Sequence, residues 1–337
     1  MKMRRNLVVA AIVSFVVLLF ITFTVASGFA KSDKPITLNF VSFVPLANKV
    51  EYQFIKDEFF DKINERAKGE LIIKTRGGPE VIAPFDLGVA VQKGTIDMAT
   101  IPTAFFESMV PGADSTKLSI YTAWEERKNG IYEYIRDMYT KAGLYYLGRG
   151  EATKPEYFNM FINKRIEKPK DFAGLKLGGS TAFHGQYKRL GASVATLAIP
   201  EYHSAMERHV VDGLVSSIYV GFVYGLHEVT KYIIGHGFYR CTVAVPVNLK
   251  TWNRLPKHLQ DLLTQCMAEF EKKYEPYEAE QKQLALKRAK AAGVEILLFP
   301  PDMVKWYIEC ANEGSWDYAR ERFPGDVIPK LRDRITK

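Results

Sequence analysis

Residues 36–75 read ITLNFVSFVPLANKVEYQFIKDEFFDKINERAKGELIIKT and contain a complete strand–helix–strand unit. Apolar side chains alternate over 36–43, which predicts a strand with one buried face. Within 52–63 the apolar residues recur at the spacing of one helical face, and Lys68-Gly69 ends that helix. A second strand is expected at 71–75. This order predicts an α/β fold, in which a parallel sheet is covered by helices.

The same alternation continues through the chain. Further strands are predicted at 144–147, 157–162, 175–177, 212–216 and 241–247, and a helix is predicted at 183–190. A long helix is expected over 259–292, which at 1.5 Å per residue spans roughly 50 Å. That length exceeds the need of one small lobe and indicates a strut across two lobes. Because no linker is visible, the chain should cross between the lobes more than once, with a ligand cleft at the crossover.

The N-terminus has the pattern of a secretory signal peptide. Basic residues at Lys2, Arg4 and Arg5 precede an apolar run over 7–25, and small residues follow up to Ala30. This pattern predicts export to the periplasm with cleavage after Ala30. The alternative is an uncleaved membrane anchor, because the apolar run is about as long as a bilayer span.

The composition excludes some classes of partner and scaffold. The formal net charge is +8, which falls to +5 without the three N-terminal basic residues, and the excess is spread along the chain. A nucleic-acid interface would need a basic cluster, so no nucleic-acid partner is expected. The three cysteines, at 241, 266 and 310, are too few for a disulfide scaffold, and we expect buried thiols or at most one bridge.

No pattern of catalytic, metal-binding or nucleotide-binding residues is visible. The six histidines show no H-E-x-x-H spacing, and no G-x-S-x-G or G-x-x-x-x-G-K-[ST] segment occurs. We therefore expect no catalytic residue, no metal and no cofactor. Catalysis by scattered residues remains the main alternative from another functional class.

Several motifs in a fixed order carry a resemblance to a known family. They are Lys168-Pro-Lys-Asp-Phe-Ala-Gly-Leu-Lys-Leu177, Leu190-Gly-Ala192, Pro200-Glu-Tyr202 and Val210-Val-Asp-Gly213, with Gly94–Met98, Val110–Ala113 and Trp252–Pro256 around them. In this order the chain resembles the TRAP-type extracytoplasmic solute receptors, the DctP-like family. The resemblance covers nearly all of the chain after residue 30.

The resemblance implies a two-lobed periplasmic-binding-protein clamshell that closes on a small organic solute without covalent chemistry. It also implies TRAP-type membrane permease subunits as partners, uptake driven by an ion gradient, and a monomeric receptor. Lobe I would comprise 31–154 and about 243–282, and lobe II would comprise 155–242 and about 283–337. An exported receptor that signals to a membrane sensor is the alternative with the same fold.

The chain departs from the family at the position that usually binds a carboxylate. Receptors of this family usually carry an arginine directly after Gly-Leu-Lys-[Ile/Leu], where this chain has Gly178. The asparagine expected three residues after Asp-Gly is replaced by Ser216. The ligand is therefore expected to be an organic acid or an aromatic compound, and a dicarboxylate is not implied. Three interpretations of 178–180 remain open: a turn with Ser180 or Thr181 as helix cap, a backbone-amide nest for an anion, or space for a bulkier solute.

The family's geometry also implies which residues line the ligand site. These residues are Phe43, Glu80, Ala104, Phe105, Arg149, Glu151, Gly179, Ser180, Thr181, Ile199, Ser216 and Tyr219. Aromatic residues outnumber charged ones among them, which favours stacking and apolar contact, although each could instead be a core residue. Arg76 or Arg149 could replace the missing cation. A buried Glu80 would suit a ligand amine, hydroxyl or cation, whereas an exposed Glu80 would be an ordinary loop residue.

Overall fold

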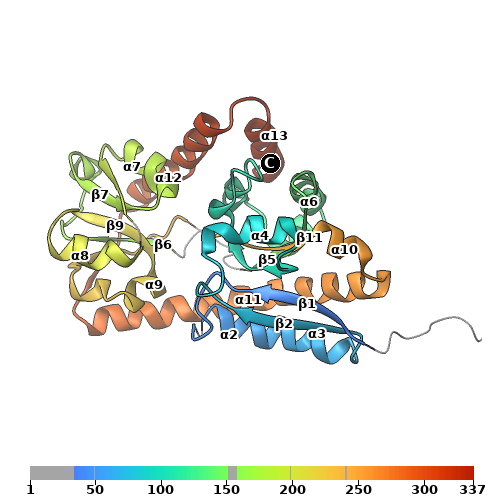
Figure 1. Ribbon diagram of the computed structural model, residues 1–337. Coiled ribbons are helices and arrows are strands. Elements are labelled where there is room, and N and C mark those ends of the chain that lie inside the picture. Colours follow the sequence, from blue (N-terminus) through green and yellow to red (C-terminus); the bar gives the residue numbers. More distant parts are fainter. Residues whose placement is uncertain (1–33, 49, 151–157, 198, 240) are drawn as a thin grey trace, which may run out of the picture. The chain divides into compact units, whose positions relative to one another are not determined.

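The computed structural model describes residues 34–48, 50–150, 158–197, 199–239 and 241–337 (Figure 1). The predicted signal peptide, residues 1–30, lies outside the described residues. In the part that the structure describes, no helix combines the length and the apolar character of a membrane span. Among the described residues the three cysteines form no disulfide bond, and Cys266 and Cys310 are buried.

The first sheet contains six strands and is mixed. Its strands are β1 (Ile36–Val41), β2 (Leu71–Gly77), β3 (Met98–Ala99), β4 (Ile101–Pro102), β5 (Leu144–Gly150) and β11 (Val243–Asn248). The order is β2-β1-β3-β11-β4, and β5 also pairs with β11. The predicted parallel pairing holds for β1 and β3. Strand β11 runs antiparallel to β3, β4 and β5, and it enters this sheet after the chain has passed through the second one.

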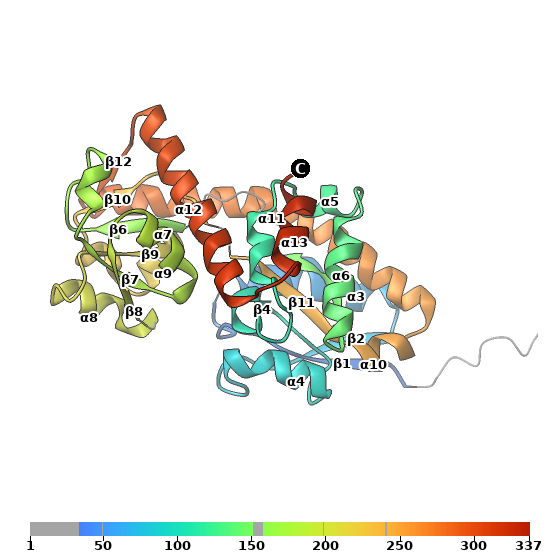
Figure 2. The ribbon, with the colours of Figure 1, turned by 90° about the horizontal axis from the view of Figure 1, so that it is seen from above.

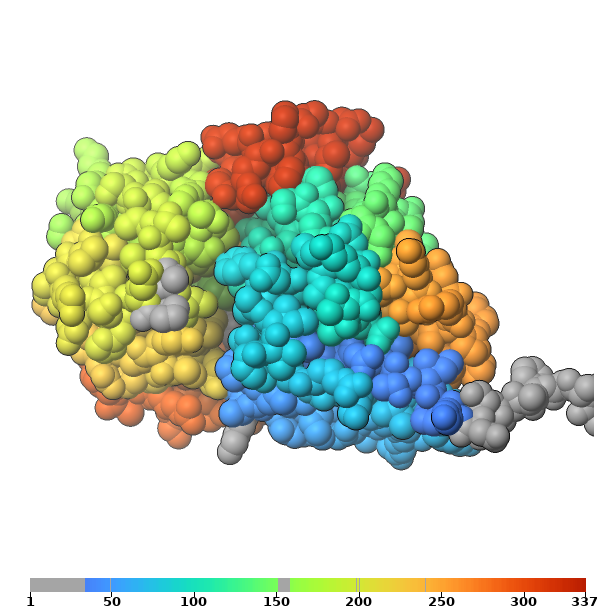
Figure 3. Space-filling view, viewed as in Figure 1, coloured from blue at the N-terminus to red at the C-terminus, as the bar shows by residue number. Residues whose placement is uncertain are grey.

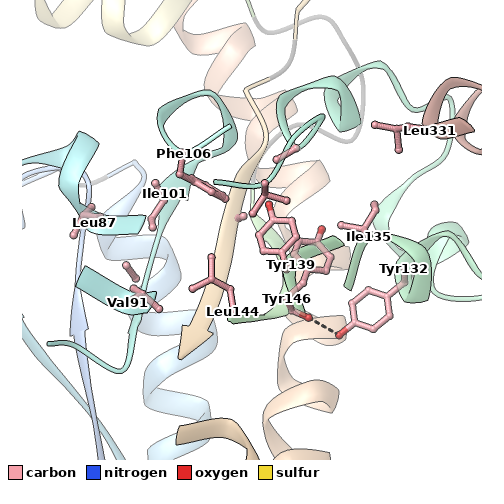
Figure 4. Packing of buried hydrophobic residues seen from close by; sticks show 14 of the residues in the cluster. Leu87, Val91, Ile101, Phe106, Tyr132, Ile135, Tyr139, Leu144, Tyr146 and Leu331 are labelled. Atoms are coloured by element: carbon pink, nitrogen blue, oxygen red, sulfur yellow. Dashed lines mark hydrogen bonds between the residues drawn. The ribbon is translucent and has the colours of Figure 1, made fainter. Parts of the chain in front are cut away.

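Helices around the first sheet bury an aromatic core. The predicted helix at 52–63 is present as α2 (Tyr52–Ile55), a π-helical turn η1 (Lys56–Phe60) and α3 (Asp61–Arg66). The others are α4 (Leu87–Lys93), α5 (Ala123–Glu126), α6 (Ile131–Lys141) and α10 (Leu249–Arg254). Figure 4 shows the core to which α4 and α6 contribute, where the Tyr132 hydroxyl donates to the Tyr146 carbonyl oxygen at 3.0 Å. This packing fixes the end of β5, where the predicted site residue Arg149 lies.

The second sheet also contains six strands and separates two cores. Its strands are β6 (Phe158–Ile162), β7 (Lys176–Gly179), β8 (Ser193–Thr196), β9 (Gly213–Ser217), β10 (Tyr232–Ile234) and β12 (Glu295–Leu297), in the order β12-β10-β6-β9-β7-β8. One core, which includes Tyr187 and Tyr307, packs under α7 (His184–Arg189) and α12 (Pro301–Arg322). The other, which includes Phe161 and Tyr202, packs under α8 (Tyr202–Glu207) and α9 (Ile218–Val223).

Helix α11 (Lys257–Ala291) is the long helix that the sequence predicts, with 35 residues. It contacts α3, α5 and β5 beside the first sheet, and α9 and β12 beside the second. The helix continues through Pro276. Because proline has no N–H, the Lys272 carbonyl lacks its usual helical partner at this point. A single helix thus lies against elements of both sheets.

Helix α12 also contributes to both halves of the fold (Figure 2). Its first part places Met303, Tyr307 and Cys310 in the core of the second sheet. Its last part places Trp316 and Ala319 in the core of the first sheet, where α13 (Val327–Ile335) follows with three buried side chains. The predicted lobe limits remain a proposal. They assign α13 to lobe II, whereas its buried side chains pack into the first core.

Candidate functional site

The two sheets come together near Tyr239, which is bridged to the start of β6, and Thr242, which directly precedes β11. The Phe158 N–H, at the start of β6, donates to the Tyr239 carbonyl oxygen at 3.2 Å. The Thr103 N–H, directly after β4, donates to the Thr242 carbonyl oxygen at 2.9 Å. Strand ends of the two sheets thus hydrogen-bond to the backbone carbonyls of Tyr239 and Thr242, which are close together in the sequence. This crossover is where a two-sheet α/β fold would present a ligand site.

A buried lysine lies at the crossover. The Lys117 Nζ is 2.5 Å from Asp114 Oδ2 and 4.4 Å from the centre of the Tyr239 ring. The other oxygen of Asp114 accepts a hydrogen bond from the Thr103 hydroxyl at 3.1 Å. The lysine charge is therefore matched by a carboxylate and faces an aromatic ring, a favourable arrangement for a desolvated cation.

Arg149 is not a free cation, as one interpretation of the sequence suggested. Its guanidinium donates to both oxygens of Glu126, with Nε–Oε2 at 3.2 Å and Nη2–Oε1 at 3.1 Å, and the side chain is 1% exposed. Burial alone would lower the pKa of Arg149, but the Glu126 carboxylate outweighs it and the pKa lies above its ordinary value. Its backbone N–H donates to Glu271 Oε1 at 3.1 Å. The other proposed replacement, Arg76, is exposed and donates to Asn39 at 2.7 Å.

A second buried carboxylate in this region is also paired. Glu271, on α11, accepts from Arg127 Nε at 2.6 Å and from Arg127 Nη2 at 2.9 Å. Arg127 in turn stacks over the Tyr132 ring at 4.1 Å. Each of the buried or nearly buried cations Lys117, Arg127 and Arg149 therefore has a carboxylate within hydrogen-bond distance.

A side chain at Gly178, the position where the resemblance implies an arginine, would have to displace Leu197 and Val211 at the end of β7. A Cβ atom on Gly178 would lie 2.6 Å from Leu197 Cδ1 and 3.0 Å from Val211 Cγ1. The Tyr187 hydroxyl also occupies this strand end, where it donates to the Gly178 carbonyl oxygen at 2.8 Å and accepts from the Val215 N–H at 3.1 Å. The hydroxyl thus bridges β7 and β9 beyond their last paired residues.

The interpretation of 178–180 as a turn with a helix cap is confirmed. Ser180 precedes the 3-10 turn η6 (Thr181–Phe183), and its hydroxyl accepts from the Ala182 N–H at 3.3 Å. Gly179 has a φ of 137°, a conformation that favours glycine. Thr181 is exposed and follows the cap directly.

The predicted residues on the first sheet fall into two environments. Phe43, Ala104 and Phe105 are half-buried, and the Phe105 ring centre lies 4.3 Å from that of Phe85, which is 68% exposed. Glu80 is exposed, and its carboxylate accepts from the Gly78 N–H at 2.7 Å, which lowers the pKa of Glu80. Glu80 is therefore a loop residue that binds its own backbone.

The predicted residues on the second sheet are also dispersed. Ser216 is buried in β9, directly opposite Asn159 of β6. Tyr219 is half-buried on α9, and burial followed by the nearby Glu51 carboxylate raises the pKa of its hydroxyl. Ile199 is exposed, and Glu151 lies outside the described residues. A hollow of about 360 Å³ lies between α7 and α12, and none of the predicted residues lines it.

Two buried polar side chains near the crossover were not expected from the sequence. Asn159 donates from Nδ2 to the Ile234 carbonyl oxygen at 2.8 Å, while its Oδ1 has no partner. The Thr242 hydroxyl is likewise buried without a partner. Such buried atoms are costly unless a water molecule or another polar group satisfies them. The signal for Asn159 was a single amide inside the apolar run of the predicted strand 157–162. Among the described residues, no group of side chains has the composition of a metal site.

Comparison with known proteins agrees with this arrangement. The family model for bacterial extracellular solute-binding protein, family 7 (DctP), matches residues 41–313. An uncharacterised protein of Haemophilus influenzae is 32% identical over 182 residues, which are 51% of this chain and 53% of that protein. The chain thus spans about half the length of this relative. A monocarboxylate 2-oxoacid-binding periplasmic protein of Nostoc sp. is 24% identical, over 80% of this chain and 75% of its own.

A solved structure shows the same fold. The TRAP periplasmic solute-binding protein of Desulfovibrio salexigens, with bound orotic acid, superposes with a TM-score of 0.74 at 19% identity. The superposition covers 89% of this chain and 98% of that chain. It confirms the predicted α/β periplasmic-binding-protein fold with a long helix near the C-terminus. Taken with the family match, the chain belongs to family 7 of the bacterial extracellular solute-binding proteins, the DctP family.

Proposed function

We propose that this receptor captures a small organic acid in the periplasm and delivers it to the membrane permease subunits of a TRAP-type transporter. Family membership over residues 41–313 carries the proposal. The Nostoc relative is named for 2-oxo monocarboxylates and the Desulfovibrio structure contains orotic acid, so both concern organic acids. The proposal includes export by the N-terminal signal peptide with cleavage after Ala30.

The electrostatics of the crossover favour a ligand with no more than one carboxylate. The buried cations Lys117 and Arg149 already have carboxylate partners, and Gly178 supplies no side-chain cation. Each buried ligand carboxylate would therefore depend on hydrogen bonds instead of an unpaired cation, and a second carboxylate would double this cost. The residues that the sequence implies for the site remain our proposal for its lining. We extend it by Asn159 and Thr242, whose unpaired atoms suit a ligand hydroxyl, N–H or carbonyl.

A thermal-shift screen tests the function directly. A ligand of the folded state stabilises by about 2.7 kcal/mol at a concentration one hundred times its Kd. We expect one or more monocarboxylates or aromatic acids, with pyruvate and orotate among the probes, to raise the melting temperature. C4 dicarboxylates should cause no rise. A clear rise with succinate or malate would refute the proposal that the ligand has no more than one carboxylate. No rise with any organic acid would refute the proposed function as an organic-acid receptor.

Replacing Phe105 by alanine should weaken the best ligand of that screen at least tenfold, because the half-buried ring at the end of η3 (Thr103–Phe105) is proposed to stack on it. Isothermal titration calorimetry measures the change. Trp306→Ala is the matched control, since Trp306 is also a half-buried aromatic residue but packs against the core that contains Phe172 and Tyr307. If both variants bind equally well, Phe105 lies outside the site.

A further inference from the structure

A buried carboxylate connects the loop after η3 to the end of helix α12. Glu107, which is 5% exposed, lies two residues beyond Phe105. Its Oε2 is 3.0 Å from Nη1 of Arg322, the last residue of α12. Beyond Arg322, α13 packs Ile328, Leu331 and Ile335 into the first core. This contact therefore lies where the C-terminal segment, which is the end of α12 together with α13, docks on the first sheet. That segment forms the red surface in Figure 3.

The groups around Glu107 differ in their access to water. Lys117 and Asp114, both on η4 (Asp114–Leu118), are buried and paired with each other. The Arg322 side chain is 40% exposed, and its Nη1 is 3.5 Å from the Tyr318 hydroxyl. Arg322 can thus keep its charge hydrated without Glu107. An ionised Glu107, in contrast, gains water only if the end of α12 moves away.

Burial and the nearby Asp114 carboxylate raise the pKa of Glu107 to about 7, against the opposing effect of Lys117 and Arg322. A carboxyl that is released into water would have a pKa near its ordinary value of about 4.3. By linkage, the conformation in which Glu107 has the higher pKa is favoured by protonation. Its advantage is therefore complete at acidic pH and disappears as the pH rises through about 7.

We propose that Glu107 is a proton-operated latch for the C-terminal segment. A proton from solvent on the Glu107 carboxylate keeps the end of α12 docked on the loop that follows Phe105, and loss of this proton favours undocking. The neutral carboxyl can still accept the hydrogen bond from Arg322, and it no longer repels Asp114. Because this loop directly follows the proposed ligand residues Ala104 and Phe105 of η3, docking of α12 would control their position. The latch itself does not depend on the identity of the ligand.

Hydrogen exchange of the ligand-free full chain tests the latch. We expect amides in residues 316–335 to exchange about tenfold faster at pH 8.5 than at pH 5.5, after correction for the intrinsic exchange rate. In Glu107→Gln, which mimics the protonated side chain, exchange should be slow at both pH values. In Arg322→Gln, loss of the cation should move the transition to higher pH. Mass spectrometry of peptides from this segment gives all three rates.

Glu313→Gln is the matched control, because Glu313 lies on the same helix and pairs with Arg332 of α13, away from the latch. This variant should keep the pH response of the wild type. Equal corrected rates at both pH values in the wild type would refute the proposal. So would faster exchange at the acidic pH, which would make the ionised pair the docked state, or a response that persists in Glu107→Gln.

Discussion

Replacement of Arg149 by methionine is expected to lower the free energy of unfolding by about 3–5 kcal/mol, because it leaves the Glu126 carboxylate buried without a counter-charge. The two side chains are 1% and 3% exposed, so water cannot compensate for the loss. Urea denaturation without ligand measures the change. The double variant Arg149→Met/Glu126→Gln should recover a large part of it, since the unpaired charge is then removed as well.

An exposed ion pair provides the matched control for this prediction. Arg165 binds Glu295 at 2.7 Å, but both side chains are about half exposed. Arg165→Met should therefore cost less than about 1 kcal/mol. If Arg149→Met also costs less than 1 kcal/mol and instead abolishes ligand binding, Arg149 is a ligand cation and not a structural one.

Replacement of Gly185 by alanine is expected to cost about 2–3 kcal/mol, although alanine normally stabilises a helix by about 1 kcal/mol relative to glycine. The added Cβ would lie 1.9 Å from the Gly314 carbonyl oxygen, where the backbones of α7 and α12 touch. The two helices would have to separate, and the core around Tyr187 and Tyr307 would loosen. Urea denaturation gives the sign as well as the size of the effect.

The reciprocal change Gly314→Ala provides an internal check, because its Cβ would lie 2.4 Å from the Gly185 carbonyl carbon. Each single variant should destabilise. The double variant should cost less than their sum, because one separation of the helices relieves both clashes. A stabilising Gly185→Ala would show that the helices do not touch at these glycines.

Much of the fold follows from local patterns in the sequence. Alternating apolar residues predicted β1, and the helical spacing within 52–63 and 259–292 predicted the helices there. Burial of one face places apolar residues at the period of the strand or helix. The antiparallel entry of β11 could not be predicted in this way. It depends on where the chain inserts between β3 and β4 after about ninety residues in the other sheet, and no local sequence pattern indicates that position.

The candidate site was predicted less completely than the fold. The pairing of Arg149 with Glu126 and that of Glu107 with Arg322 join residues far apart in the chain, so neither leaves a spacing signal. A buried charge and a surface charge look alike in a sequence until the partner is known. The cap formed by Ser180 was predictable, because its hydroxyl binds a backbone N–H only two residues ahead.

The crowded environment of Gly178 also limits how the ligand specificity of this receptor could change during evolution. Any side chain at this position meets Leu197 and Val211, and the Tyr187 hydroxyl already holds the neighbouring carbonyl. A single Gly178→Arg mutation would therefore destabilise the protein before it could allow a new solute to bind. Descendants that acquire such a residue should carry smaller side chains at 197 or 211 that arose first.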